Sequence, residues 1–354
     1  MAVTKGNAAT GRRATRKIQW LAIGVVVLVV AYSALWWFLA GRLERGAEAA
    51  IATARQNGVE IACPDRDVRG YPFRLGVFCG ETGASLPDGT RIEAGAFRSA
   101  AQIYRPGLVI SELDAPVSVE GPGVSVSADW TSARASTRLG TEQLQLGVLE
   151  ASDLTLSLAP RGGVPLSAKA DALVASVRPN GTALDAAVTL TNLDPEPVAG
   201  RDVPPIDLGL DASLTGGAEA LAYGGRPVES LRGREIDLRA LELDLGEGGA
   251  LTASGTVAVD DEGLASGEIA LAFTDLAATL DATARLVPEL APQIEAAGPL
   301  LAQAGGGLVG NLLGGGENRD MPESDPKMTR VTIALDRGRA KVGLFPIGVV
   351  PPLP

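Results

Sequence analysis

Apolar and polar residues alternate along most of the chain, between residues 91 and 273, in runs of five to eight positions. The run Val124, Val126, Ala128 and Trp130 shows the pattern clearly. Gly, Pro, Asn or Asp interrupts the alternation about every 8 to 12 residues, as in EGPG, RPNG and DDEG. A period of two with turn residues at this spacing is typical of short strands, and predicts about fifteen of them.

Short connections between these strands favour antiparallel pairing, and strict alternation makes one face of the sheet apolar and the other polar. A sheet of this many strands must twist and curl or split into two packed sheets. We therefore expect a mainly β fold, a long curled antiparallel β-meander over residues 59–273. Its apolar face lines either an elongated groove or the closed core of a sandwich, because both need the same alternation.

A continuous apolar run precedes this region at residues 18–40, where 23 positions carry no charge. At about 1.5 Å per residue the run is roughly 34 Å long, enough to cross the hydrocarbon core. Trp20 lies near one end, and Trp36 and Trp37 lie near the other, where the two membrane interfaces fall. We predict a transmembrane helix rather than a cleaved signal peptide, whose apolar core is shorter.

Residues 1–17 form a basic tail with five Lys or Arg and no acidic residue. Basic residues beside a membrane span favour the cytoplasmic side. The expected topology is a single-pass bacterial inner-membrane protein with a cytoplasmic N-terminus. The bulk of the chain then lies in the periplasm.

Helical patterns appear at two further places. Residues 41–58 carry Leu43, Ala47, Ala50, Ile51 and Ala54 on one face, which predicts a juxtamembrane helix that ends near Asn57-Gly58.

Beyond the meander, a helical stripe divided by prolines predicts a helical cap at residues 274–304. The Gly-rich residues 305–328 are expected to form a flexible linker. Residues 329–354 form a closing β-hairpin and a Pro-rich tail.

The chain has only two cysteines, Cys63 and Cys79. In an oxidising compartment their default state is a disulfide, worth about 3 kcal/mol in the chain-entropy model for a loop of this size. A pair of free thiols is the alternative.

Between and beside the cysteines, the stretch DVRGYPFRLGVFCG concentrates the aromatic residues Tyr71, Phe73 and Phe78. These three rings either plug the first hairpin or line the mouth of a groove near the membrane.

The start of the chain, an apolar helix followed by a Cys, GYPFRL and a second Cys, resembles an alphaproteobacterial family, domain of unknown function 2125. The closing stretch TRVTIALDRGRAKVGLFPIGVVPPLP resembles the end of the same family. The stretch GTVAVDDEGLASGEIALAF is similar to the hairpins of AsmA-like envelope proteins. That second resemblance implies a β-sheet curled around an apolar groove, and a role in outer-membrane assembly or phospholipid transport.

Composition narrows the chemistry. Hydrophobic residues make up 46% of the chain but aromatic residues only 4%, so the core consists mainly of Leu, Val, Ile and Ala. The chain has no His, which removes the commonest general base and metal ligand. No nucleophile or phosphate-loop motif stands between a strand and a helix. We expect no enzyme, no catalytic residue, no cofactor and no metal site.

Acidic residues give two minor alternatives. Asp65 and Asp67 are the carboxylates that would serve an enzyme acting on envelope polymers, the least favoured hypothesis. Asp260, Asp261 and Glu262 read as a hairpin turn rather than a metal site. The net charge of −11 argues against nucleic acid as a partner.

Two functional hypotheses remain. In the first, the protein is anchored in the inner membrane through residues 18–40 and binds or passes lipid acyl chains, with phospholipid as a partner in envelope maintenance. In the second, it is a structural or scaffolding envelope protein with a self-filled β core, and its acidic surface docks a protein partner.

Overall fold

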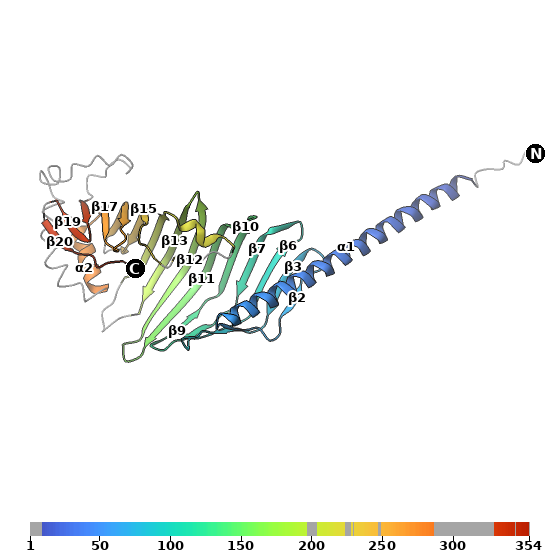
Figure 1. Cartoon of the computed structure of the whole chain (residues 1–354), viewed down its shortest axis with the longest axis horizontal. Helices are drawn as coiled ribbons and strands as arrows, with labels where there is room; N and C mark the ends of the chain where they lie inside the picture. The colour runs from blue at the N-terminus through green and yellow to red at the C-terminus, as the bar shows by residue number, and fades with distance from the viewer. Residues whose placement is uncertain are drawn as a thin grey trace, which may run out of the picture.

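The computed structural model describes residues 9–196, 204–223, 228, 230–246, 249–286, 329–343 and 345–353. It begins with one helix, α1 (Ala9–Gln56). The two segments that the sequence separates, 18–40 and 41–58, therefore belong to a single continuous helix. The helix stops where Gly58 adopts φ +80° and Val59 N–H donates to the carbonyl of Ala54. In Figure 1 its amino-terminal half projects away from the rest of the molecule.

Within the residues that the structure describes, twenty strands follow in one antiparallel sheet. The first ten are β1 (Glu60–Ala62), β2 (Asp67–Arg69), β3 (Arg74–Cys79), β4 (Thr82–Ser85), β5 (Arg91–Ala94), β6 (Phe97–Gln102), β7 (Arg105–Leu113), β8 (Val117–Glu120), β9 (Val124–Asp129) and β10 (Ser132–Leu139). The others are β11 (Leu144–Pro160), β12 (Leu166–Asn180), β13 (Ala183–Pro195), β14 (Ile206–Leu214), β15 (Glu235–Asp244), β16 (Ala250–Val259), β17 (Ala265–Phe273), β18 (Thr329–Asp336), β19 (Arg339–Val342) and β20 (Phe345–Val349). The described residues also include a 3-10 turn, η1 (Gly217–Leu221), and α2 (Leu276–Leu286).

The first ten strands are halves of five longer ones. Strands β3 and β4 pair with β6 and β5 in one uninterrupted register, from Arg74 opposite Gln102 to Ser85 opposite Arg91. Strands β9 and β10 likewise pair with β11 as one strand. Counted this way, each long strand pairs with its neighbours in sequence, and the sheet is a meander from β1–β2 to β20.

The breaks between these halves lie side by side and form a line across the sheet, which we call the crease. It passes through the breaks at residues 80–81, 95–96, 114–116 and 130–131, and continues through Asp153 within β11 and Asn192 within β13. Asp153 and Asn192 each have φ +52°, a conformation in which Asp and Asn are over-represented. Neighbouring breaks are bonded to one another, as where Thr131 N–H donates to the carbonyl of Ser152.

Within a strand, odd-numbered residues point to the apolar side before the crease and even-numbered residues point to it afterwards, or the reverse. The apolar side of the sheet itself stays the same. In β11 the apolar residues are Leu149 and Ala151 before Asp153, but Leu154 and Leu156 after it. Ala151 and Leu154 nevertheless pack in one buried cluster with Ala170, so both lie on the same side. One apolar face therefore continues across the bend.

Helix α2 packs on this apolar face near the carboxyl end of the sheet. Its Leu276 joins Phe273, Val331 and Val342 in the largest buried cluster. The side chain of Asp275 accepts a bond from Ala278 N–H and so caps the first turn of the helix. Of the predicted cap at 274–304, residues 287–304 lie outside the described residues, as does the predicted linker at 305–328.

The mainly β prediction, with an apolar N-terminal helix and a long antiparallel sheet, is confirmed. Figure 1 shows a broad twisted sheet that curves from β2–β3 beside α1 to β20 at the far end. Leu149 of β11 and Val174 of β12 lie on opposite faces and are 41% and 42% exposed, so this part of the sheet is one layer thick.

Candidate functional site

The apolar face is the most extensive chemical feature of the molecule. One cross-strand row of this face runs without interruption over eight strands, β10 to β17. Its members are Ala133, Ala151, Leu173, Leu190, Leu208, Leu243, Leu251 and Phe273. At about 4.8 Å between strands the row is roughly 34 Å long.

A second apolar row lies beside the first. It consists of Ala135, Leu149, Ala175, Val188, Leu210, Leu241, Ala253, Leu271 and Val331. Most of these residues are only half-buried, and Leu149 is 41% exposed. Together the two rows form a strip of aliphatic side chains that water reaches in part.

The opposite, polar face is built from cross-strand ion pairs. Arg98 lies opposite Glu112, and Glu112 lies opposite Arg134. Arg98 also donates two hydrogen bonds to the carboxylate of Asp114. Each exposed pair of this kind contributes little to the free energy of unfolding. Together the charged side chains keep this face of the sheet exposed to solvent.

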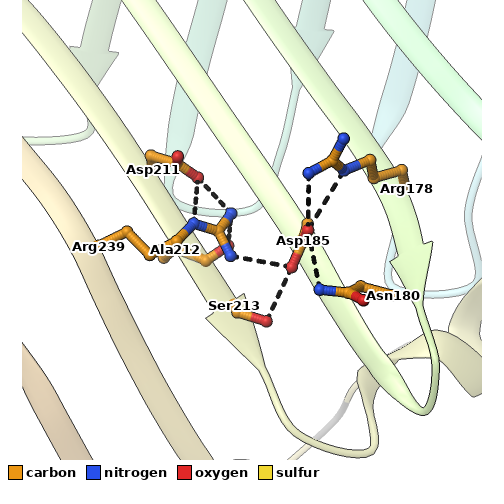
Figure 2. Close-up of polar contacts among 7 residues, drawn as sticks. All are labelled: Arg178, Asn180, Asp185, Asp211, Ala212, Ser213 and Arg239. Carbon is orange, nitrogen blue, oxygen red and sulfur yellow. Dashed lines mark hydrogen bonds and ion pairs between the residues drawn. The ribbon is translucent and has the colours of Figure 1, made fainter.

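A buried carboxylate organises the same polar face farther along the sheet (Figure 2). Asp185 of β13 is 3% exposed and accepts hydrogen bonds from Ser213 at 2.8 Å, Arg239 at 3.0 Å and Arg178 at 3.1 Å. Burial acts to raise the pKa of Asp185, but these hydrogen bonds outweigh it and lower the pKa to about 2. Arg239 also bonds Asp211, so it bridges two carboxylates.

Arg239 sits where the pairing of β15 slips by one residue against both of its neighbours, β14 and β16. Such a bulge leaves one residue outside the regular ladder and re-aims its side chain. The two carboxylates hold that side chain in place, so the Asp185 cluster has a structural explanation.

The disulfide between Cys63 and Cys79 is confirmed, with the Cα atoms 5.5 Å apart. It joins the corner between β1 and β2 to the end of β3, at the crease. In the same corner the carboxylate of Asp65 accepts the N–H of Gly80 at 2.9 Å. Asp65 therefore serves as a local backbone partner.

Of the three aromatic residues proposed for a groove mouth, the structure brings two together. Tyr71 and Phe73 lie in the turn between β2 and β3, 51% and 65% exposed. Phe78 lies opposite Arg98 on the polar face, with the guanidinium of Arg69 5.6 Å from the centre of its ring. Phe78 thus does not line the apolar face, because successive strand residues point to opposite sides.

The turn at 70–74 is fastened to α1. Tyr32 Oη donates to the carbonyl of Pro72, and Trp36 Nε1 donates to the carbonyl of Arg74 at 2.9 Å. The Trp36 and Tyr71 rings meet edge to face, with their centres 5.5 Å apart. This end of the sheet is therefore held directly against the helix.

A hollow of about 290 Å³ lies at the opposite end of the first strands. Ile61, Ala84 and Ile92 form its apolar part, and Arg55 and Arg91 stand among its charged residues. These three apolar residues face one another in register across β1, β4 and β5.

The acidic residues singled out in the sequence have ordinary roles. Asp67 pairs with Arg69, whose hydrogen bond lowers the pKa of Asp67. Asp260 accepts the N–H groups of Glu262 and Leu264 in the turn between β16 and β17. Among the described residues, no group of three or more His, Cys, Asp or Glu could hold a metal ion.

Sequence patterns did not reveal the crease, the Asp185 cluster or the contact between α1 and the first turn. Each depends on register, which brings Arg239 to Asp185 across 54 residues. Only the position of Phe78 could have been found from the sequence. Phe78 is even-numbered, whereas the apolar residues Leu75, Val77 and Cys79 of the same strand are odd-numbered, so Phe78 points to the other face.

The family model described as "Uncharacterized protein conserved in bacteria (DUF2125)" matches residues 36–351. No curated protein and no solved structure matches the chain. In the described part of the chain, one helix is long and apolar enough to cross a membrane, over residues Arg16–Gln56.

Proposed function

Because the chain belongs to the DUF2125 family of uncharacterized bacterial proteins, we propose its function from its own geometry. The protein is anchored in the inner membrane by α1, and it binds or passes lipid acyl chains along its apolar face in the periplasm. It acts by binding and not as an enzyme. Its amino terminus is cytoplasmic.

The continuous, half-exposed apolar face carries this proposal. An acyl chain needs a dry lining and no polar partner, and rows of Leu, Val and Ala supply that lining. Each buried methylene contributes about 0.8 kcal/mol, so affinity follows from contact length rather than from a specific group. The opposite face is unsuited to lipid because charged residues line it.

Helix α2 supports the alternative function in part of the molecule. It covers the apolar face over β16 to β19, and its Ala282 also packs with Ile206 and Leu245 beside β14 and β15, so there the protein fills its own core. If the whole face is covered in this way, the protein is a structural or scaffolding component of the envelope.

A photoreactive phospholipid separates the two functions. We would express the full chain in bacteria supplied with a diazirine fatty acid, irradiate the cells and map the labelled peptides. Lipid binding predicts labels on β11 to β15 as well as on α1. Labels confined to α1 would reject lipid binding by the sheet and favour the scaffold.

Two matched substitutions sharpen this test. Leu149 and Val174 are 41% and 42% exposed on neighbouring strands, but they lie on the apolar and polar faces respectively. Leu149→Gln replaces one lipid contact by a polar group, worth about 1 to 2 kcal/mol, and should lower labelling of the sheet roughly tenfold. Val174→Gln should leave labelling unchanged. Equal effects of the two substitutions would contradict binding on the apolar face.

A further inference from the structure

The turn at residues 70–74 meets α1 inside the apolar run and not beyond it. Its partners on the helix are Tyr32, Ser33 and Trp36, and the first charged residue after the run is Arg42. At about 1.5 Å per residue, these three positions lie roughly 9 to 15 Å on the membrane side of Arg42. A helix that places its apolar run in the bilayer therefore carries this turn to the membrane surface.

A second turn lies beside the first. Ile103 N–H, between β6 and β7, donates to the carbonyl of Phe73 at 3.1 Å. The next residue, Tyr104, is 68% exposed. The two turns together present three exposed aromatic rings, Tyr71, Phe73 and Tyr104, at one end of the sheet.

Arginines accompany these rings. Arg74 follows the first turn, Arg105 follows the second, and both are exposed. Gln102 lies opposite each of them in the sheet, so the two arginines sit at the same level. Aromatic rings at the boundary between headgroup and acyl chain, with arginines reaching the phosphates, are typical of segments that enter a membrane interface.

The turns at the other end of the same strands lack the aromatic rings. Residues 86–90 read LPDGT and residues 121–123 read GPG, with no aromatic residue, although Arg91 follows the first of them and Arg161 donates to the carbonyl of Pro122 in the second. Arginines thus stand at both ends, but the exposed aromatic rings are found at the end that touches the apolar part of α1.

We infer that the turns at 70–74 and 102–105 insert into the interface of the outer leaflet of the phospholipid bilayer that α1 spans. The rings of Tyr71, Phe73 and Tyr104 enter the acyl boundary, and Arg74 and Arg105 bind lipid phosphates. The sheet then starts within the membrane surface. This inference rests on the anchoring proposed above, but not on lipid binding by the apolar face.

Site-specific photo-crosslinking tests the inference on the full chain. Benzoylphenylalanine replaces Phe73 or Tyr104, one at a time, and the protein is reconstituted into vesicles of phosphatidylethanolamine and phosphatidylglycerol. Lipid adducts are measured by intact mass after irradiation. Leu28, in the middle of the apolar run, is the positive control. Glu120, exposed at the opposite end of the strands, is the negative control.

We expect adducts at positions 73 and 104 with yields close to that at 28 and at least tenfold above that at 120. Adducts at 28 but not at 73 or 104 would overturn the inference and leave the anchor intact. No adduct at 28 either would overturn the anchor together with the inference. Both tips are exposed, so replacement should not disturb folding, and an intact Cys63–Cys79 disulfide verifies this in each variant.

Discussion

At the scale of single residues, Asp185 shows how a charged group is tolerated inside a thin sheet. Its carboxylate is nearly inaccessible to water, yet hydroxyl and guanidinium donors on three strands satisfy it. A buried charge is costly unless it is paired and hydrogen-bonded, and here both conditions are met. This carboxylate and that of Asp211 both accept hydrogen bonds from the bulged Arg239, so they hold the bulge of β15 in place.

Asp185→Asn keeps the shape of the side chain but removes its charge. We expect this variant to lose roughly 2 to 4 kcal/mol of unfolding free energy, because two guanidinium groups lose a charged partner. Chemical denaturation, monitored by circular dichroism, measures this loss of unfolding free energy. Asp237→Asn, an exposed neighbour in the same cross-strand row, is the control and should change stability little.

The depressed pKa of Asp185 also predicts a pH dependence. The pKa is about 2 in the folded protein against an ordinary value of 3.8, so the unfolded chain takes up the proton first. The corresponding stabilisation, about 2 kcal/mol, is complete above about pH 5 and is mostly lost as the pH falls to about 2. Denaturation midpoints across this window should fall more steeply in the natural protein than in Asp185→Asn. Parallel curves would refute the role given to this carboxylate.

At the scale of elements, the crease explains how one sheet bends while its apolar face stays continuous. The long strands from β3–β4 to β11, and β13 as well, carry an irregular position on the same line, and at Asp153 and Asn192 this position is left-handed. At each irregular position the alternation of inward and outward side chains is displaced by one residue, and neighbouring strands share this displacement. Without that shared shift, leucines beyond the bend would point to the polar side.

The disulfide secures the first corner of this crease. Reduction, or replacement of both Cys63 and Cys79 by Ser, should lower the unfolding free energy by about 3 kcal/mol. Thermal unfolding with and without reductant measures the difference. A double Ser variant as stable as the natural protein would show that the Asp65–Gly80 bonds suffice to hold the corner.

Sequence reasoning recovered the strands and the one-sided apolar face, because period-two alternation depends only on local order. It also recovered the cysteine pair, since no third cysteine competes. It grouped Phe78 with Tyr71 and Phe73 because the three are close in sequence. The alternation of side chains along the strand, which directs Phe78 to the polar face, was given less weight. The Asp185 cluster lay beyond its reach, since Asp185, Ser213 and Arg239 come together only through the register of three strands.

At the scale of the whole molecule, the helix and the sheet form one unit. The half-buried stripe of α1 continues from Tyr32 through Trp36, Ala40, Leu43 and Ala47 toward the end of the helix. Glu48 of α1 pairs with Arg66 in the corner beside the disulfide. The orientation of the sheet relative to α1 is thus fixed by packing.

Two adjacent tryptophans test this coupling. Trp36 is 5% exposed and Trp37 is 71% exposed, although both belong to the same turn of α1. Trp36→Ala should cost about 3 kcal/mol or more and speed hydrogen exchange at residues 70–74, because packing and the bond to Arg74 are lost. Trp37→Ala should change neither. Similar exchange in both variants would mean that the helix does not hold the sheet.

The meander order of the sheet has a consequence for how the chain acquires its structure. Each long strand finds its partner next to it in sequence, so pairing can advance strand by strand from the first disulfide-closed corner. Contacts that are local in sequence close small loops and favour fast folding. During synthesis, which begins at the amino terminus, the strands can therefore pair in the order in which they are made. Each new strand pairs with the edge strand of the sheet that has already formed.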